Sequence, residues 1–312
     1  MDKHWMKQAR FGLCGCWLLA LLAFSVKSAD AAEYLKPPPA MSQPISVGVT
    51  GDNLSSWSDM PAGTYAIPDS QVRVAGHQNI GTGSLAFGIF GVMASISSNS
   101  ATGEKLVRDT EEKLKIKLND RVLAVAKDLI ASEAFREKYA IEKANNASSV
   151  LFTPGLVLTF ATDTEVIPYI VLKTHLRDSG GSEVWMSRYL IPAGKPRPMI
   201  GEGGWMDNDG VALNDAIQSG LEAGLRFALN DIRAPYPRDT NSKVYVVTRM
   251  TYLRTRVRGA FLKLMEDERF IAISFRAGGL TGIHLLDKAG ITEVRPPKDD
   301  DRGFDIVAPD TK

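Results

Sequence analysis

The sequence predicts an α+β protein in which amphipathic helices pack on an antiparallel sheet and a small C-terminal β-barrel follows. Three observations lead to this prediction. Apolar residues recur at helical spacing in two segments, near residues 104–139 and 207–233. Two strand-like segments joined by a tight turn lie between them. After Lys243 the apolar period changes from about 3.6 to 2, as is typical of short strands.

The first helical segment extends from Glu104 to about Tyr139, and it is either continuous or broken near Ser132, which could serve as an N-cap. Its apolar residues are spaced so that they share one face: Leu114, Leu118, Val122, Val125 and Leu129. The second carries the stripe Leu213, Ile217, Leu221, Leu225 and Ala228. We expect Asp207 or Asp209 to cap it and Gly220 and Gly224 to pack closely on the sheet.

The sheet is predicted from a hairpin. Val166–Leu176 is rich in β-branched and aromatic residues, residues 178–181 (Asp-Ser-Gly-Gly) turn the chain, and Glu183–Ile191 runs back. Leu156–Phe160 is a further strand, and Pro168 indicates an edge or a bulge. Shorter strands are expected near residues 46–50 and 69–75.

Residues 240–296 are predicted to form the small barrel, of the SH3-like or Sm-like kind. Its strands are expected at Val244–Met250, Arg254–Met265, Arg269–Phe275, Gly282–Leu286 and Ile291–Val294, with a 3₁₀ turn at 287–290. Residues 297–312 are predicted to be a disordered acidic tail.

The N-terminal 31 residues have the three parts of a secretory signal peptide. Lys3, Lys7 and Arg10 precede an uncharged run at 11–26, and small residues at 28–31 suit cleavage after Ala31. The uncharged run is short for a membrane span, and an uncleaved anchor is the alternative. Export would place the protein in the periplasm, and cleavage would remove Cys14 and Cys16, its only cysteines.

Residues 32–103 are expected to form an extended arm followed by a Gly-rich apolar segment, ahead of an α+β domain at 104–235. The apolar segment, residues 80–98, is uncharged. Burial in the core is favoured over contact with a membrane or another subunit, for which the contact residues would be Gly83, Phe87, Gly88, Phe90 and Gly91, and a membrane span is the third alternative.

Compact catalytic signatures are missing from the sequence. It contains no H-E-x-x-H metal motif and no G-x-S-x-G nucleophile elbow, so no metal or cofactor is expected. Residues 81–86 match a dinucleotide fingerprint but lack the surrounding βαβ pattern. After cleavage the chain has 33 Lys and Arg against 34 Asp and Glu, which argues against nucleic acid as the main partner.

One constellation suits an anionic ligand. Arg254, Arg256 and Arg258 alternate along one predicted strand and would project from one face. Residues 238–295 hold eleven Lys and Arg against six Asp and Glu. Guanidiniums bind phosphate and carboxylate groups, and envelope anions are the candidates after export. The alternative is that the acids at 266–268 or 299–301 balance these arginines.

The order of parts in residues 80–233 resembles a class of uncharacterised exported proteins of Gram-negative bacteria. The resemblance rests on the Gly-rich patch, an amphipathic helix, a β-hairpin and residues 205–210 (Trp-Met-Asp-Asn-Asp-Gly) opening a helix that ends near Asp231. The resemblance implies a periplasmic location and does not imply any particular activity.

The sequence therefore predicts a non-enzymatic, envelope-associated periplasmic protein with a binding or accessory role. Its partner would be an envelope anion or another protein, and peripheral membrane contact and the oligomeric state stay open. Two alternatives remain. One is a metal-independent periplasmic hydrolase whose catalytic residues are dispersed along the chain. The other is a subunit of an envelope or secretion complex.

Overall fold

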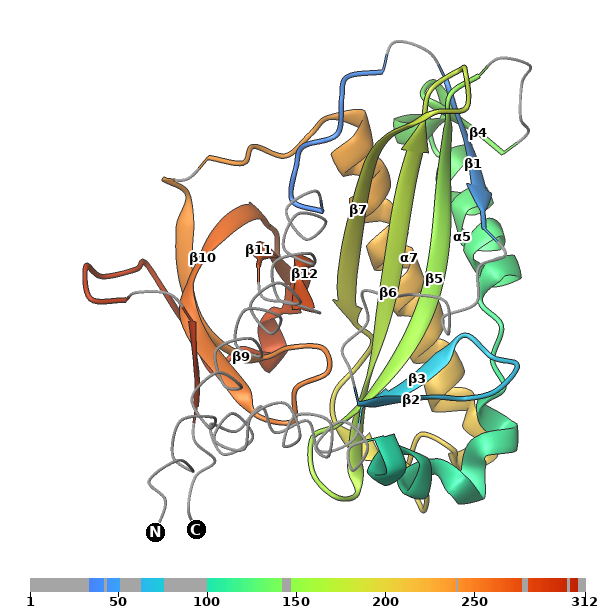
Figure 1. Ribbon diagram of the computed structural model, residues 1–312, viewed down its shortest axis with the longest axis vertical. Helices are drawn as coiled ribbons and strands as arrows, with labels where there is room; N and C mark the ends of the chain where they lie inside the picture. The colour runs from blue at the N-terminus through green and yellow to red at the C-terminus, as the bar shows by residue number, and fades with distance from the viewer. Residues whose placement is uncertain are drawn as a thin grey trace, which may run out of the picture.

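A computed structural model describes residues 34–41, 44–50, 63–75, 100–141, 147–239, 241–276, 280–301 and 304–307. The predicted signal peptide and the Gly-rich segment at 80–98 lie outside these ranges, and so do Gly83, Phe87, Gly88, Phe90 and Gly91. Within them the protein is a mixed α+β structure with a large, mostly antiparallel open sheet and few helices (Figure 1). The coarse fold class predicted from the sequence is confirmed.

The described strands belong to one sheet, whose main path runs β13-β9-β10-β11-β12-β7-β6-β5-β1-β4. Off this path, β14 pairs with β10, β2 with β3, β3 with β5, and β8 with β6. The strand bounds are β1 Ile45–Val49, β2 Thr64–Ala66, β3 Val72–Ala75, β4 Tyr139–Ala140, β5 Ser149–Phe160, β6 Glu165–Arg177, β7 Glu183–Pro192, β8 Arg197–Pro198, β9 Lys243–Arg249, β10 Arg256–Glu266, β11 Phe270–Phe275, β12 Gly282–Asp287, β13 Glu293–Arg295 and β14 Phe304–Ile306.

Two helices, α5 (Asn119–Ala131) and α7 (Val211–Arg233), accompany the central strands β5, β6 and β7 (Figure 1). Shorter helical pieces are residues 100–107, η2 (Arg108–Leu114), α6 (Glu133–Arg136), η3 (Asp207–Gly210) and η5 (Lys288–Gly290). No helix of these ranges is long and apolar enough to span a membrane.

Side chains alternate between the two faces of a strand, and in the central strands both faces are buried. In β6, Ile170 and Leu172 belong to the core shared with α5 and α7, whereas Tyr169 and Val171 belong to a second core formed with the C-terminal strands. This two-sided burial explains the nearly continuous apolar sequence of the hairpin. The hairpin prediction is confirmed, with β6 and β7 paired antiparallel.

Pro168 lies inside β6, a strand with neighbours on both sides. β7 ends at Pro192, opposite Tyr169, and β8 pairs with β6 only at Glu165 and Val166. Pro168 therefore falls between two partners, where a residue without an N–H group is tolerated. The strand edge predicted from this proline is therefore confined to the short stretch of β6 between its pairings with β8 and β7.

The close packing predicted for Gly220 and Gly224 of α7 is confirmed. A Cβ atom on Gly220 would lie 3.0 Å from the Cβ of Ala193, and one on Gly224 would lie 2.7 Å from Cδ1 of Ile191. Without side chains at these positions, α7 approaches the sheet to a distance that larger residues would prevent.

The first predicted helix is not continuous. Its five stripe residues are all buried, but residues 115–118 are not helical and a second break falls at the predicted Ser132. At the first break Gln71 replaces the helical hydrogen bonds. Its side-chain oxygen accepts from Leu118 N at 2.5 Å, and its backbone N–H donates to Ile116 O at 2.8 Å. Ser132 makes no side-chain N-cap bond; its hydroxyl donates to Leu129 O.

The predicted cap of α7 is wrong. Gly210 occupies the N-cap position with φ 77°, and neither Asp207 nor Asp209 caps the helix. Asp207 accepts instead from the amides of Gly203 and Asn208, both at 2.9 Å. The Asp207 carboxylate therefore accepts from backbone amides of its own turn and not from those of the helix.

The C-terminal strands appear near their predicted positions, together with the predicted 3₁₀ turn, here η5. The small SH3-like or Sm-like barrel is not confirmed. β12 pairs parallel with β7 at Ile283–Tyr189 and His284–Leu190, so these strands continue the large open sheet. Part of the predicted disordered tail is ordered, because β14 pairs with β10 at 257–259.

The described part of the N-terminal arm lies against β7. Tyr34 is buried, and its carbonyl accepts from the hydroxyl of Ser187 at 2.8 Å. The carbonyl of Lys36 accepts from the indole of Trp185 at 2.9 Å. The guanidinium of Arg188, itself buried, lies 5.0 Å from the centre of the Tyr34 ring. These contacts make the arm part of the packed structure.

Candidate functional site

A cavity of about 320 Å³ lies where the ends of β6 and β7 approach β9, β10 and β12, and we call it the cationic cavity. Its volume is within the range of small-molecule sites. Its lining consists of Ile167, Tyr169, Leu190, Pro192, Gly194, Lys195, Pro196, Thr248, Arg249, Met250, Thr251, Arg256, His284, Leu285, Leu286, Asp287, Ala289, Gly290 and Thr292.

Two arginines face each other at this cavity. Arg249 is the last residue of β9, Arg256 is the first of β10, and the two are direct cross-strand partners. Like charges directly opposite each other destabilise a sheet. Lys195, from the loop after β7, adds a third cation. None of these three side chains makes an ion pair or hydrogen bond with any residue that the structure describes.

The environment of Arg249 disfavours its charge. Burial, and then repulsion by Arg256, lower the pKa of the Arg249 guanidinium below its usual value. Tyr169 and Glu165 act in the opposite direction, but Glu165 lies beyond ion-pair distance. A guanidinium remains protonated in proteins, so an anion in the cavity would relieve this repulsion.

The single carboxylate of the described lining is already engaged. Asp287 accepts from the amide of Ala289 at 2.9 Å as the cap of η5, and from Nε of Arg269 at 3.5 Å. The cavity therefore keeps an excess of positive charge. The one carboxylate that could offset the cavity cations already accepts from the amide of Ala289 and from Arg269.

A hydroxyl group in the lining is unsatisfied. Thr251 is fully buried, and its Oγ1 atom has no hydrogen-bond partner among the residues described. A buried polar group without a partner costs about 1–3 kcal/mol. Together with the repelling arginines, Thr251 leaves donor capacity at this cavity that the protein itself does not use.

His284 also lines the cavity but is not a proton-transfer group at neutral pH. It is fully buried, and its Nε2 lies 2.8 Å from the carbonyl of Leu280. Burial, followed by repulsion from Arg188, lowers its pKa to about 4 despite that bond. A second histidine, His175, has Nδ1 2.6 Å from Oε2 of Glu183 on the hairpin. Both histidines therefore have a hydrogen-bond partner.

The structure separates the three arginines predicted from the sequence. Arg254 precedes β10 and pairs with Asp163 at 2.9 Å, and Arg258 pairs with Asp305 of β14 at 3.0 Å. Only Arg256 lines the cavity. The acids that balance the other two are neither those at 266–268 nor those at 299–301.

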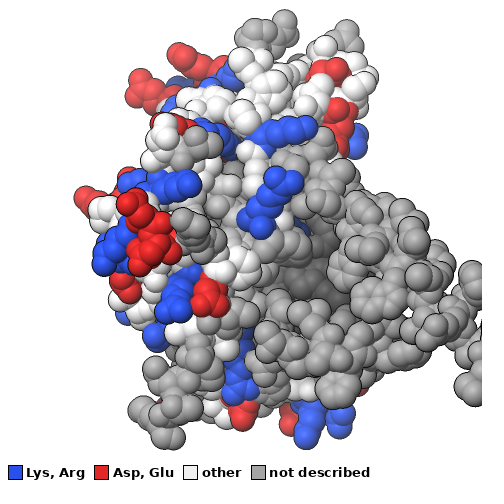
Figure 2. Space-filling model, turned by 60° about the vertical axis from the view of Figure 1, so that its left-hand side comes forward, with Lys and Arg blue, Asp and Glu red and all other residues white. Residues whose placement is uncertain are grey.

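Sequence reasoning missed Arg249 and Lys195. Antiparallel pairing of the two strands predicted at 244–250 and 254–265 would have brought Arg249 opposite the arginine cluster, so a signal for it existed. Lys195 lies in a loop, and no periodicity points to it. On the face shown in Figure 2, Lys and Arg are interspersed with Asp and Glu over the described surface. The described surface on this side is therefore not a broad basic face.

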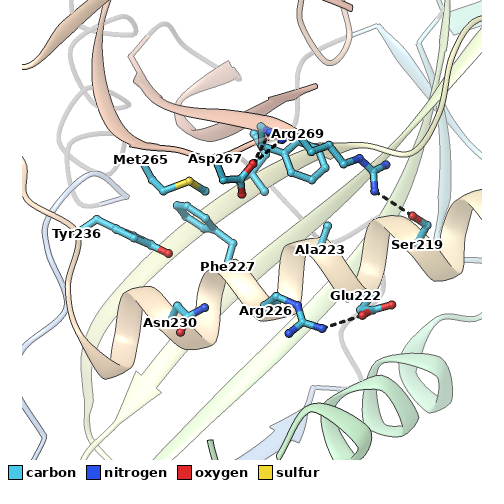
Figure 3. Close-up of a pocket in the computed structure, with 12 residues that line it drawn as sticks. Ser219, Glu222, Ala223, Arg226, Phe227, Asn230, Tyr236, Met265, Asp267 and Arg269 are labelled. Atoms are coloured by element: carbon cyan, nitrogen blue, oxygen red, sulfur yellow. Dashed lines mark hydrogen bonds and ion pairs between the residues drawn. The ribbon is translucent and has the colours of Figure 1, made fainter. Parts of the chain in front are cut away.

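A second cavity, of about 270 Å³, lies between α7 and the turn joining β10 to β11 (Figure 3). Its charged groups have partners. Glu222 and Arg226 pair at 2.8 Å, Arg269 reaches Ser219 at 3.5 Å, and Asp267 accepts from the amides of its own turn. Because these groups are satisfied, this cavity is a weaker candidate than the cationic cavity.

Metal and triad chemistry find little support in the described residues. They hold no group of three or more His, Cys, Asp or Glu side chains that could bind a metal ion. The lining described for the cationic cavity includes a histidine and an aspartate but no serine. Comparisons with protein-family models, curated proteins and solved structures find no match. The chemistry of the cavity is therefore the main guide to function.

Proposed function

We propose that this protein is an exported, envelope-associated binding protein of the periplasm that holds an anionic ligand in the cationic cavity. The observation that carries the proposal is the direct opposition of Arg249 and Arg256, neither of which has a partner among the described residues. Like charges directly opposite each other destabilise a sheet, and an anion bound between the two guanidiniums would offset that repulsion. The predicted signal peptide supports the periplasmic location.

Binding is favoured over hydrolysis. A general base needs a pKa near the working pH, and the low pKa of His284 and its bond to the Leu280 carbonyl make it a poor base. Asp287 is the only carboxylate in the described lining, and it already caps η5.

The proposal is tested by titrating the purified mature protein with inorganic phosphate in a calorimeter at low salt. Arg256→Gln should weaken binding at least about tenfold, because a charged hydrogen bond contributes about 1.5–3 kcal/mol. Arg258→Gln is the matched control: it lies two residues along the same strand and pairs with Asp305. It should bind within about twofold of wild type. Equal losses in both variants, or no binding by wild type, would reject the proposal.

The location is tested separately. Osmotic shock should release a chain that begins at Ala32, and part of it should sediment with anionic liposomes at low salt and dissociate at high salt. A chain that retains residues 1–31 would contradict export by a cleavable signal. A chain that stays wholly in solution with those liposomes would contradict envelope association, while the phosphate titration would still test anion binding.

A further inference from the structure

We propose that the ligand of the cationic cavity is a phosphate monoester carried on a small organic group. This inference rests on the proposed function and narrows it from anions in general to one chemical class. Charge, size and hydrogen-bonding capacity each contribute to the argument.

The charge of the described lining favours an anion with more than one negative charge. Three cations, Lys195, Arg249 and Arg256, stand against the carboxylate of Asp287, which also pairs with Arg269 outside the described lining. His284 is neutral at physiological pH, so a charge of at least +2 remains. A phosphate monoester carries about −1.5 to −2 at pH 7, whereas a monocarboxylate or a phosphodiester carries −1 and would leave one cation unpaired.

The size of the cavity exceeds the need of a bare inorganic ion. Sites of about 300–1,000 Å³ hold organic ligands, and this one measures about 320 Å³. Apolar side chains line much of the remaining space. Ile167, Leu190, Met250, Leu285 and Leu286 are all buried members of the lining. The small organic group of the ester would contact these residues.

Thr251 supplies a separate argument. Its hydroxyl is buried without a partner, and an oxygen atom of a phosphate group would accept its hydrogen bond. Arginine guanidiniums offer planar pairs of donors that suit the remaining phosphate oxygens. A phosphate group has enough acceptor oxygens to satisfy the arginines and the threonine together.

Calorimetric titration with four probes tests the inference: phenyl phosphate, inorganic phosphate, benzoate and benzyl alcohol. We expect phenyl phosphate to bind at least about tenfold more tightly than each of the others. If benzoate binds as tightly, the phosphate class is wrong although anion binding stands. If inorganic phosphate binds as tightly, the organic group is wrong. If no anion binds, the proposed function fails as well.

Thr251→Val gives a test that a merely structural role would not pass. Valine has nearly the shape of threonine and removes only the unpartnered hydroxyl, so the free protein should be as stable as wild type or more stable. Phenyl phosphate binding should nevertheless fall about tenfold. Thr174→Val is the matched control, because the Thr174 hydroxyl is also buried without a partner among the described residues but lies outside the described lining of the cavity. It should leave binding within about twofold. Unchanged binding in Thr251→Val would overturn the role of this hydroxyl.

Two sources could supply the phosphate monoester, namely a lipid headgroup and a soluble metabolite. Phosphatidylcholine vesicles containing about one-fifth phosphatidic acid separate them. Sedimentation with these vesicles that Arg256→Gln abolishes and Arg258→Gln preserves identifies the headgroup. Failure to sediment, with phenyl phosphate binding intact, identifies a soluble ester. Sedimentation that Arg258→Gln abolishes as fully as Arg256→Gln would overturn headgroup binding in the cavity.

Discussion

The guanidinium of Arg238 donates two hydrogen bonds, of 2.7 and 2.8 Å, to the fully buried carboxylate of Asp231. The same carboxylate accepts from the hydroxyl of Tyr189 at 2.9 Å and from the amide of Tyr236 at 3.1 Å. This network ties the end of α7 to β7 and to the segment that leads into β9. It lets the chain leave the helix without an uncompensated buried charge.

Removing Arg238 should therefore be strongly destabilising. Arg238→Met leaves Asp231 buried and unpaired, and we expect the free energy of unfolding to fall by about 3 kcal/mol or more. Arg226→Met removes an exposed ion pair with Glu222 and should change it by less than about 0.5 kcal/mol. Urea unfolding followed by circular dichroism measures both. Similar small losses in the two variants would contradict the role given to the buried pair.

Gly220 should not tolerate alanine even though alanine favours helices by about 1 kcal/mol. The new Cβ would lie 2.9 Å from Cγ1 of Ile170 and 3.0 Å from the Cβ of Ala193, and the latter cannot rotate away. Overpacking costs about 1–3 kcal/mol, so we expect a net loss of about 1 kcal/mol in thermal or urea unfolding. Gln218→Ala, at an exposed position of the same helix, should be neutral or slightly stabilising. A stabilised Gly220→Ala variant would show that the helix has room to shift.

Acid should destabilise the protein partly through His284. Its pKa is about 4 in the folded protein against about 6.5 when unfolded, so the unfolded chain binds the extra proton between these values. Stability is lost as pH falls through this window, and the histidine contributes a loss of about 2 kcal/mol between pH 7.5 and 5. His284→Gln keeps a donor for Leu280 O and removes the titration. Unfolding curves at the two pH values should show a smaller loss for the variant; parallel losses would exclude His284 as a source.

The docked arm should contribute to stability. Tyr34 is buried over Arg188, and Tyr34→Ala would expose that guanidinium and leave a cavity. We expect a loss of about 3 kcal/mol in urea unfolding, as for other buried aromatic residues. Pro39→Ala, at an exposed position of the same arm, should change stability by less than about 0.5 kcal/mol. Equal stability of wild type and Tyr34→Ala would mean that the arm is not part of the packed structure in solution.

Local pattern predicted much of the secondary structure because burial imposes a period on each element. The stripe from Leu213 to Ala228 and the alternation in β9 to β12 mark faces that must be covered. The same pattern gave a wrong prediction where a residue distant in the sequence formed hydrogen bonds with backbone groups of the expected helix. Gln71 breaks the first helix at Leu118 although the apolar stripe continues through the break.

The candidate site was predicted only in part, for a related reason. Three arginines at alternate positions indicated a cluster, yet Asp163 and Asp305, both remote in sequence, neutralise two of them. Arg249 and Lys195 replace them at the cavity. Partners of this kind depend on which strands become neighbours, and spacing along one strand contains no information about that.

By itself, the sequence determined the α+β class, the central hairpin, the two buried helical stripes and the expectation of export. Only the tertiary structure decided that β12 joins β7, so that the C-terminal strands extend the large sheet, and that Arg249 and Arg256 meet beside Lys195. The physical reason is the range of the interactions. The amphipathic period of a helix or strand can be read from the residues of that element alone. Strand order and the charges that line a cavity depend on contacts between segments distant in the sequence.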